Sequence, residues 1–388
     1  MGVVMSQGGV WRMAATLVAL GVSAASVAAP PLKTETLSIE PVPKPGPHWL
    51  YLVDAANSHM IDARLVIYDA DHKKIVAQVG AGSWPGLAAS PDRRYSYVAT
   101  SYLSRGTRGD RTDVLEITDN SSFEKIAEVV LPPKHVQVVT ASFDTSVSRD
   151  GKFAYVSNIT PATSITVVDL QHRKVTGEID TAGCVLSYPS GNRRVTALCE
   201  SGRALTFTLN DAGKEISCQQ SDAFIDVDRD PLYVNAQHLG DKYVFLSHHG
   251  MIRTADFSKG AGQFGPPWSL LSEPERAAGW RPGGNQPFSL QEKTGRIYVA
   301  MHQGVDGSHK DPGTEIWVYD LARRTRIARW NLAALKVEPI TSIQVSQDDK
   351  PMVYGTGGAD LIVLDAASGR LLQNEKQLGE SFDVMAAF

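Results

Sequence analysis

The densest group of residues with binding chemistry is a run of three arginines, Arg105, Arg108 and Arg111. They lie within seven positions of a 388-residue chain whose 38 basic and 42 acidic side chains give a formal net charge of −4. A guanidinium group presents a planar fork of N–H donors that matches a carboxylate. Two interpretations follow. The arginines pair with acids inside the fold, where Asp110 and Asp113 are available, or they face an acidic partner.

Signatures of catalysis and of metal binding are missing from the sequence. It contains no Gly-x-Ser-x-Gly, no phosphate-binding loop, no Cys-x-x-Cys-His and no His-Glu-x-x-His. Among the ten histidines, His248, His249, His302 and His309 come nearest to a cluster. Adjacent histidines on a strand point to opposite faces, and no carboxylate partner is evident. We therefore predict neither a catalytic residue nor a metal site in this chain.

Two of the three cysteines are predicted to form a disulfide bond. Cys184 and Cys199 are each seven residues from the dipeptide Gly191-Asn192, which is typical of a two-residue hairpin turn. Such a turn places the two cysteines opposite each other, at the short separation that a disulfide requires. Cys218 is left single and is interpreted as a packed thiol.

The elements that would position these residues recur along the chain. Seven runs of β-forming residues end in an acidic or amide residue, and each follows a turn and an earlier β-forming run. The terminating residues are Asp69, Asp119, Asp169, Asn210, Asp256, Asp320 and Asp365. Their mean spacing of about 49 residues is typical of propeller blades. We predict an all-β fold, a seven-bladed β-propeller over residues 48–388. Six or eight blades, a solenoid or a two-sheet sandwich are the alternatives.

The longest interval between two of these residues, from Asp256 to Asp320, contains an insertion at roughly residues 260–290. Insertions in propellers emerge as loops on one face, where partners and ligands bind. The insertion is therefore predicted to be available for interaction.

Composition and the N-terminus indicate an exported globular protein. A hydrophobic content of 43% with a small net charge excludes a disordered chain and a nucleic-acid-binding surface. Residues 1–28 have one charge, Arg12, an apolar run and a small-residue cleavage pattern ending at Ala28, which predicts a signal peptide. A membrane anchor is the alternative. Residues 29–47 are rich in proline and are predicted to form an extended arm. No later segment could span a membrane, so we expect an exported protein with no membrane partner.

The arginine run also carries a resemblance to a known family. An aromatic residue followed by Arg-x-x-Arg-Gly-x-Arg-Ser/Thr-Asp is matched by Tyr102, Arg105, Arg108, Gly109, Arg111, Thr112 and Asp113. Further matching segments are residues 131–134, 161–165, 279–284, 307–310 and 345–348, together with the cysteine pair. From about residue 45 to near its C-terminus, the chain resembles the heavy subunit of the quinoprotein amine dehydrogenases, the methylamine and aromatic amine dehydrogenase family.

The resemblance implies a specific assembly. Heavy chains of this family are seven-bladed propellers that pair with a small, disulfide-rich light chain in a periplasmic complex of two heavy and two light chains. The light chain carries tryptophan tryptophylquinone and the general base, so no cofactor is expected to be bound covalently by the present chain. Primary amines are oxidised to aldehyde and ammonia, and the electrons pass to a small copper protein or a cytochrome.

The resemblance also assigns residues to two roles. The substrate channel would include Asn57, His59 and Tyr102. Asn57 stands where family members have a phenylalanine, which would make the channel more polar and the amine larger or more polar than methylamine. The interface with the light chain would include Arg105, Arg108, Trp280, Arg281, Gly283 and Gly284.

Two other interpretations of the function stay open. A stand-alone secreted propeller would serve as a binding or scaffold protein and would be complete by itself. A single-chain, lactonase-type hydrolase would need a central ring of carboxylates or histidines around a metal. The dehydrogenase interpretation predicts a large exposed apolar surface that a partner must cover.

Overall fold

A computed structural model describes residues 42–387, except residues 56 and 139. The predicted signal peptide and residues 29–41 of the predicted arm lie outside the described residues. Residues 42–48 precede the first strand without a regular element. In the described part of the chain, no helix combines the length and hydropathy needed to cross a membrane.

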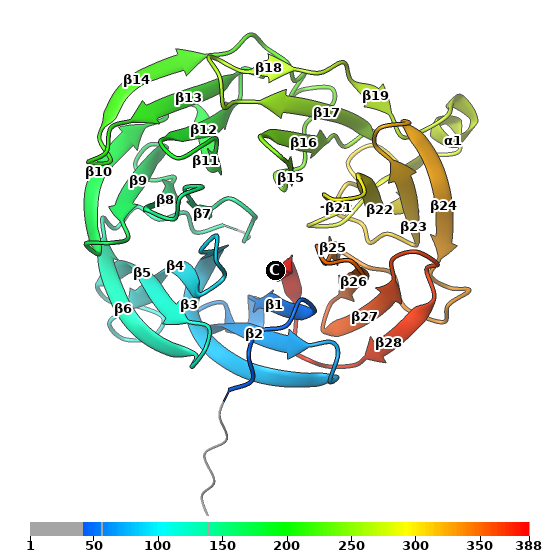
Figure 1. The fold of residues 1–388 in the computed structure, drawn as a ribbon, viewed down its shortest axis with the longest axis horizontal. Coiled ribbons are helices and arrows are strands. Elements are labelled where there is room, and N and C mark those ends of the chain that lie inside the picture. Colours follow the sequence, from blue (N-terminus) through cyan, green and yellow to red (C-terminus); the bar gives the residue numbers. More distant parts are fainter. Residues whose placement is uncertain (1–41, 56, 139, 388) are drawn as a thin grey trace, which may run out of the picture. The chain divides into compact units, whose positions relative to one another are not determined.

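The described residues form an all-β fold in which antiparallel sheets follow one another around a central axis (Figure 1). The largest sheet has seven strands, in the order β29 (Phe382–Ala387), β1 (Trp49–Asp54), β2 (Ala63–Asp69), β3 (Lys74–Ala89), β4 (Tyr95–Leu103), β5 (Arg111–Asp119) and β6 (Glu124–Leu131). Its strand β3 serves two ladders, because residues 74–82 pair with β2 and residues 83–89 pair with β4.

The other sheets contain four or five strands each. The next two contain β7 (Thr145–Val147), β8 (Phe153–Asn158), β9 (Ser164–Asp169) and β10 (Lys174–Asp180), then β11 (Cys184–Pro189), β12 (Arg194–Cys199), β13 (Ala204–Leu209) and β14 (Glu215–Gln220). They are followed by β15 (Gln237–Leu239), β16 (Lys242–Leu246), β17 (Met251–Asp256), β18 (Gln263–Phe264) and β19 (Trp268–Ser269). The last two contain β20 (Trp280–Pro282), β21 (Phe288–Gln291), β22 (Arg296–Gln303), β23 (Glu315–Asp320) and β24 (Thr325–Asn331), then β25 (Ser342–Val345), β26 (Met352–Gly357), β27 (Asp360–Asp365) and β28 (Leu371–Glu375). The short helices are η1 (Asn57–His59) and α1 (Glu273–Ala277).

The seven predicted pairs of β runs are confirmed as neighbouring antiparallel strands. The earlier runs are β1, β4, β8, β12, β16, β22 and β26, and they pair in turn with β2, β5, β9, β13, β17, β23 and β27. Most residues of these middle strands are buried, and in β1 and β8 every residue is. The outermost strands are exposed, and all six residues of β14 face solvent. The hydrophobic core therefore lies between neighbouring sheets.

The acidic or amide residue that terminates each unit closes a turn. The carboxylate of Asp119 accepts the backbone N–H of Ser121 at 2.8 Å, and that of Asp365 accepts the N–H of Ser368 at 2.8 Å. The amide oxygen of Asn210 likewise accepts the N–H of Ala212 at 3.0 Å. Short polar side chains of this kind stabilise turns by bonding to the backbone two or three residues later. The repeated residues are thus structural.

The ring closes between the two ends of the described chain. The C-terminal strand β29 pairs antiparallel with β1 (Figure 1). The side chain of Gln286, which precedes β21, accepts the N–H of Met385 at 3.0 Å. It also donates to the carbonyl of Met385 at 3.2 Å. Strand pairing and a buried amide therefore both hold the closing strand.

The predicted disulfide between Cys184 and Cys199 is confirmed, but the predicted turn is wrong. The N–H of Ser190 bonds to the carbonyl of Arg194, so three residues, not two, separate the paired ends of the hairpin. A bulge between Val185 and Tyr188 shifts the register by one residue and brings the cysteines opposite each other again. Cys218 is exposed on β14, so its interpretation as a packed thiol is wrong.

The predicted insertion at residues 260–290 is only partly a loop. Strands β18 and β19 pair with β17 and extend the outer edge of its sheet, and α1 follows. Strand β20 then adds to β22 of the next sheet. Backbone pairing therefore absorbs much of the segment, because an edge strand leaves N–H and C=O groups that a following segment can satisfy.

Candidate functional site

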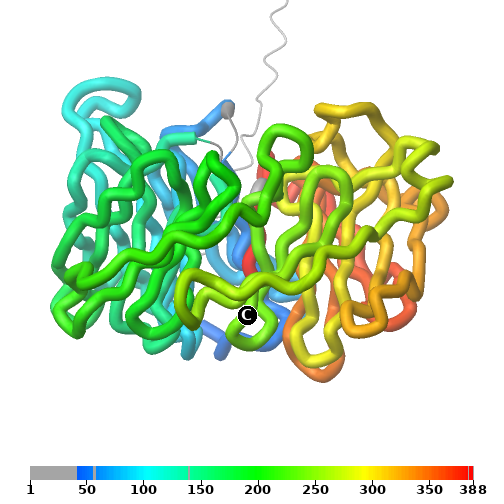
Figure 2. Tube along the Cα trace, turned by 90° about the horizontal axis from the view of Figure 1, so that it is seen from above, coloured from blue at the N-terminus to red at the C-terminus, as the bar shows by residue number. Residues whose placement is uncertain are grey.

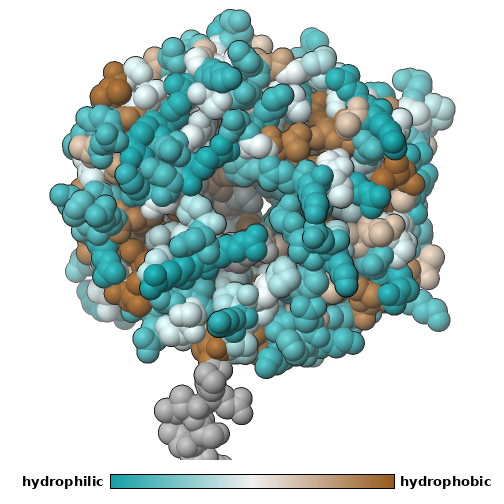
Figure 3. Space-filling model, viewed as in Figure 1, coloured by the Kyte–Doolittle hydropathy of each residue, from teal (hydrophilic) through white to brown (hydrophobic). Residues whose placement is uncertain are grey.

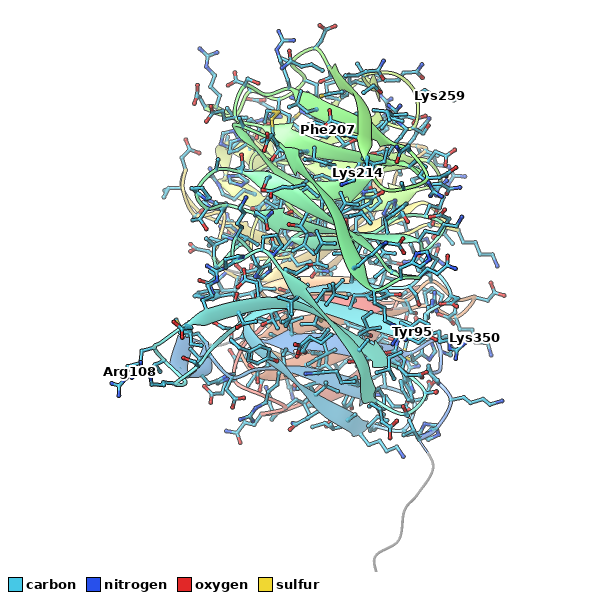
Figure 4. All side chains as sticks on the ribbon, turned by 90° about the vertical axis from the view of Figure 1, so that its left-hand side faces the viewer. Tyr95, Arg108, Phe207, Lys214, Lys259 and Lys350 are labelled. Carbon is cyan, nitrogen blue, oxygen red and sulfur yellow. A yellow bond between two sulfur atoms is a disulfide. The ribbon has the colours of Figure 1, made fainter. Side chains whose placement is uncertain are left out.

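The connections of the sheets divide between two faces. Counted outward from the centre of the ring, the second strand is linked to the third on one side of the molecule, as in the β4–β5 hairpin. The links from one sheet to the next open on the same side, which we call the hairpin face. Figure 2 shows the β4–β5 hairpin as a cyan loop rising at the upper left. In Figure 4, Arg108 projects from this face, whereas Tyr95 and Lys350 lie at the opposite one.

Arg111, the last arginine of the run, forms an internal ion pair. Its Nε and Nη2 donate to the two carboxylate oxygens of Asp113 at 2.6 and 2.7 Å. Asp113 is buried and also accepts the hydroxyl of Ser101 and the N–H of His135, each at 2.8 Å. Arg111 completes the network by donating to the carbonyl of His135. Arg111 therefore pairs with an acid inside the fold, the first of the two interpretations.

Arg105 and Arg108 lie at the tip of the hairpin and are exposed. The tip is closed by the backbone, with the N–H of Arg105 bonded to the carbonyl of Arg108 at 3.0 Å. Within the described residues neither guanidinium group has a hydrogen bond or an ion pair. Two positive charges are therefore presented on the hairpin face without an internal acid, which fits the partner-facing interpretation.

The predicted channel residues lie on the hairpin face, and the polar groups of Tyr102 and His59 point inward. The Tyr102 hydroxyl donates to the buried carboxylate of Glu116 at 2.6 Å. Burial, and then Glu116, raise the pKa of Tyr102 above its usual value. His59, in the β1–β2 connection, turns its Nε2 toward Asp54 at 3.6 Å and Glu380 at 3.8 Å. Asn57 begins η1, and its side chain lies outside the described part of the structure.

Four of the predicted interface residues are packed within this chain. Trp280 contacts Trp317, with 4.9 Å between ring centroids, and Arg281 donates to the carbonyl of Val305. Gly283 and Gly284 are buried. A Cβ atom at Gly283 would lie 2.3 Å from the carbonyl oxygen of Asp311, and one at Gly284 would lie 2.1 Å from that of Thr341. Close backbone approach therefore explains both glycines.

Exposed apolar side chains gather on the hairpin face. Of the large hydrophobic residues that are exposed in the described part, seven lie in its connections or at the strand ends beside them: Ile61, Tyr102, Val138, Ile159, Val185, Val234 and Val305. The other five lie on outer strands, and none lies in a connection of the opposite face. On that opposite face, hydrophilic residues predominate around the central hollow (Figure 3). Apolar surface concentrated on one side is typical of a protein interface.

A cavity of about 330 Å³ lies at the centre of the ring. It is lined by the innermost strands, including Thr145, Gln237 and Gln344. Asp144 precedes β7 and is buried, and its carboxylate accepts the N–H of Ala141 at 2.8 Å. Burial raises the pKa of Asp144 to about 7 because the charged form loses its hydration.

The histidines that come nearest to a cluster in the sequence are only partly brought together. His248 and His309 stack with 4.1 Å between ring centroids, whereas His249 turns toward Asp230 and Asp306. Burial, and then His309, lower the pKa of His248 to about 4. His302 bonds to Ser308 instead. The described residues contain no group of three or more histidine, cysteine or acidic side chains that could hold a metal.

Sequence reasoning missed the acid that anchors Tyr102, and it expected an exposed apolar surface without placing it on the hairpin face. Glu116 stands between Leu115 and Ile117 in a strand, and an acid inside an apolar run is a usable signal of a buried partner. The exposed valines and isoleucines gave no such signal, because they come from separate segments of the sequence. Only the arrangement of the sheets places them on one face.

Comparisons with known proteins identify the family of this chain. A family model for the methylamine dehydrogenase heavy chain (MADH) matches residues 47–388. The methylamine dehydrogenase heavy chain of Methylophilus methylotrophus is 26% identical over 358 residues, covering 90% of this chain and 85% of the relative. That of Paracoccus versutus is 28% identical over 344 residues, covering 87% and 78%. Among solved structures, the dihydro-heme d1 dehydrogenase NirN superposes with a TM-score of 0.52 at 15% identity, covering 88% of this chain and 66% of NirN, a likeness of fold alone. Because the family match spans nearly the whole described chain, this protein belongs to the methylamine dehydrogenase heavy chain family.

Proposed function

We propose that this chain is the heavy, non-quinone subunit of a periplasmic amine dehydrogenase that oxidises a primary amine to aldehyde and ammonia. Membership of the heavy chain family supports the class of enzyme. The observation that carries the proposal is the gathering of exposed apolar side chains on the hairpin face, where the predicted channel and the free arginines also lie. Exposed apolar residues that share one face of a protein are the kind of surface that a partner covers.

The partner in this proposal is a light chain, in an assembly of two heavy and two light chains. The light chain would hold tryptophan tryptophylquinone, which supplies the two-electron oxidation of the amine. Trp49 and Trp317 of the present chain serve its own fold, since both are buried in the core. A small copper protein or a cytochrome would accept the electrons.

The contribution of this chain would be to shape the approach to the quinone and to exclude water from it. Tyr102 is suited to form a wall, because its hydroxyl is held by Glu116 while the residue is 37% exposed. His59 is held near Asp54 beside the same face. With Asn57 in place of a phenylalanine, the amine would be larger or more polar than methylamine.

A ring of seven blades is part of this proposal. It is supported by the division of β3 between two ladders, which separates the seven-stranded sheet into a blade of β29, β1, β2 and the first half of β3 and a blade that begins with the second half. Each of the remaining sheets would be one blade.

The proposal is tested by purifying the native complex without denaturant and recording its visible spectrum before and after primary amines are added. We expect a small subunit to co-purify and a quinone band to bleach with the preferred amine. Comparing methylamine with larger and polar amines also tests the role of Asn57. A colourless single chain that binds no light chain would reject the proposal and favour a stand-alone binding protein.

A further inference from the structure

An apolar groove opens on the hairpin face beside the Cys184–Cys199 disulfide. Its volume is about 350 Å³. Its apolar wall includes Val185, Leu198, Ile225, Val227, Leu232 and Val234. Val185 is 46% exposed and Val234 is 39% exposed, so apolar surface stands open to solvent at the groove.

The backbone of the groove is held in place from below. The N–H groups of Phe224 and Ile225 both donate to the carbonyl of Gly202, at 2.9 and 3.2 Å. At the other end of the segment, the hydroxyl of buried Tyr188 donates to the carbonyl of Val234 at 2.7 Å. The exposure of the valines therefore belongs to a formed surface, which lowers the ordering cost of binding.

The rim of the groove is acidic. Glu200 lines it, and the segment 222–230 interleaves Asp222, Asp226 and Asp228 with the apolar residues of the wall. All four acids are exposed. Within the described residues, the side chains of Glu200, Asp222 and Asp228 have no hydrogen-bond or ion-pair partner. Asp226 accepts the backbone N–H of Arg229 at 3.1 Å, and its carboxylate lies 3.9 Å from the Arg229 guanidinium group. The groove thus combines uncovered apolar surface with uncompensated negative charge.

We propose that this groove receives a segment of the partner light chain in which an apolar side chain is flanked by lysine or arginine residues. The inference rests on the proposed function, because it presupposes that a light chain covers the hairpin face. An apolar side chain would remove Val185 and Val234 from water, and the flanking cations would face the acidic rim. The groove belongs to the same face as the other exposed apolar residues, which one partner would cover together.

The charges of the hairpin face add a constraint on the partner. Arg105 and Arg108 present positive charge on the β4–β5 hairpin, whereas the groove presents negative charge. The light chain must therefore offer an acidic patch to the hairpin and a basic patch to the groove. Opposite charges at separate points favour one docking orientation over others.

The test compares heavy chain variants for affinity to the light chain isolated from the native complex. Val185→Lys places a cation in the groove and is matched by Ile216→Lys, a change at a 62% exposed residue on outer strand β14 of the same sheet. We expect the dissociation constant to rise about tenfold or more for Val185→Lys and to stay within about twofold for Ile216→Lys.

A second pair of variants tests the charge of the rim. Asp228→Lys is matched by Glu124→Lys, at an exposed acid on outer strand β6. Asp228→Lys should weaken assembly and reduce its dependence on salt, whereas Glu124→Lys should do neither. Because all four residues are exposed, the melting temperature of each isolated variant should equal that of the wild type.

The outcomes separate this inference from the proposed function. If Val185→Lys and Asp228→Lys assemble as the wild type does, the groove is not part of the interface, although the subunit role stands. If the wild-type chain has no light chain to bind, the proposed function fails as well. Saturable binding of benzylamine to the isolated chain, abolished by Val185→Lys without any change in assembly, would assign the groove to a small amine and overturn the inference.

Discussion

Arg108 and Arg111 stand three residues apart in the sequence but differ in what they bind. Arg111 neutralises a buried carboxylate, whereas Arg108 projects from the hairpin face without a partner among the described residues (Figure 4). The same residue type in one short run therefore serves stability at one position and is free for binding at the other. Burial of the acid decides between the two roles.

Substitution of the two arginines by alanine should separate these roles. Arg111→Ala leaves Asp113 charged, buried and without its bidentate partner, which should destabilise the isolated chain by about 3–5 kcal/mol. Arg108→Ala should leave its unfolding free energy unchanged and weaken assembly with the light chain. Urea denaturation measures the first effect and titration with the light chain the second. A destabilised Arg108→Ala variant would place that arginine in an internal network.

Gly284 provides a second prediction at the scale of the residue. Its φ is +115°, and a Cβ atom would meet the carbonyl oxygen of Thr341 at 2.1 Å. Gly307 has a φ of +88° with open space around it, so it shares the unusual backbone but not the clash. Gly307→Ala should cost about 1–2 kcal/mol, the penalty for a left-handed backbone alone, and Gly284→Ala clearly more. Equal losses in a denaturant titration would show that close approach plays no part.

At the scale of the element, the β11–β12 hairpin shows how turn and strand determine a register together. Its turn is one residue longer than predicted, and the bulge at Leu186 and Ser187 compensates by one residue. A bulge inserts an extra residue on one strand and so changes which residues face each other. The cysteines meet because both features are present.

Removal of this disulfide should destabilise the chain by about 3 kcal/mol, as expected for a loop of 15 residues. The double variant Cys184→Ala/Cys199→Ala should therefore unfold at lower denaturant concentration. Cys218→Ala is the control, because its thiol is exposed and unpaired in the described structure. The native chain should contain one thiol that reacts without reductant. Three reactive thiols in the native chain would contradict the bond.

At the scale of the whole molecule, repeated units make repeated contributions to stability. The hydrogen bond from the Ser121 hydroxyl lowers the pKa of Asp119, and that from Ser368 lowers the pKa of Asp365. These carboxylates add stability above their unfolded pKa, and this stability is lost as the pH falls through the lower folded value. Asp144 acts in the opposite sense, because its raised pKa favours the protonated folded state and loses that advantage as the pH rises toward 7.

Stability should therefore fall below about pH 4, where the carboxylates with lowered pKa become protonated, and again as the pH rises from about 4 to 7, where Asp144 loses its proton. Asp365→Asn keeps an acceptor, as Asn210 does at the equivalent place. It should reduce only the loss of stability at acid pH. Asp144→Asn keeps the bond to the N–H of Ala141 and should flatten the decline between pH 4 and 8. The free energy of unfolding, measured from pH 2.5 to 8, checks both. If Asp144→Asn left the neutral side unchanged, the carboxyl group would not be protonated in the fold.

Local sequence determined the strands, the turn-closing residues and the cysteine pair of this protein. The periodicity of the residues, the turn residues and the β-branched runs are patterns of a few neighbouring positions. The units that end at Asp69 and at Asp365 could therefore be predicted in the same way. Tertiary structure alone decided that Arg111 is internal and Arg108 free, that Gly283 and Gly284 are needed for close packing, and that Val185 and Val234 share a face with Tyr102. The reason is physical: burial and proximity depend on which connections the ring brings to the same side, and residues far apart in the sequence meet only there.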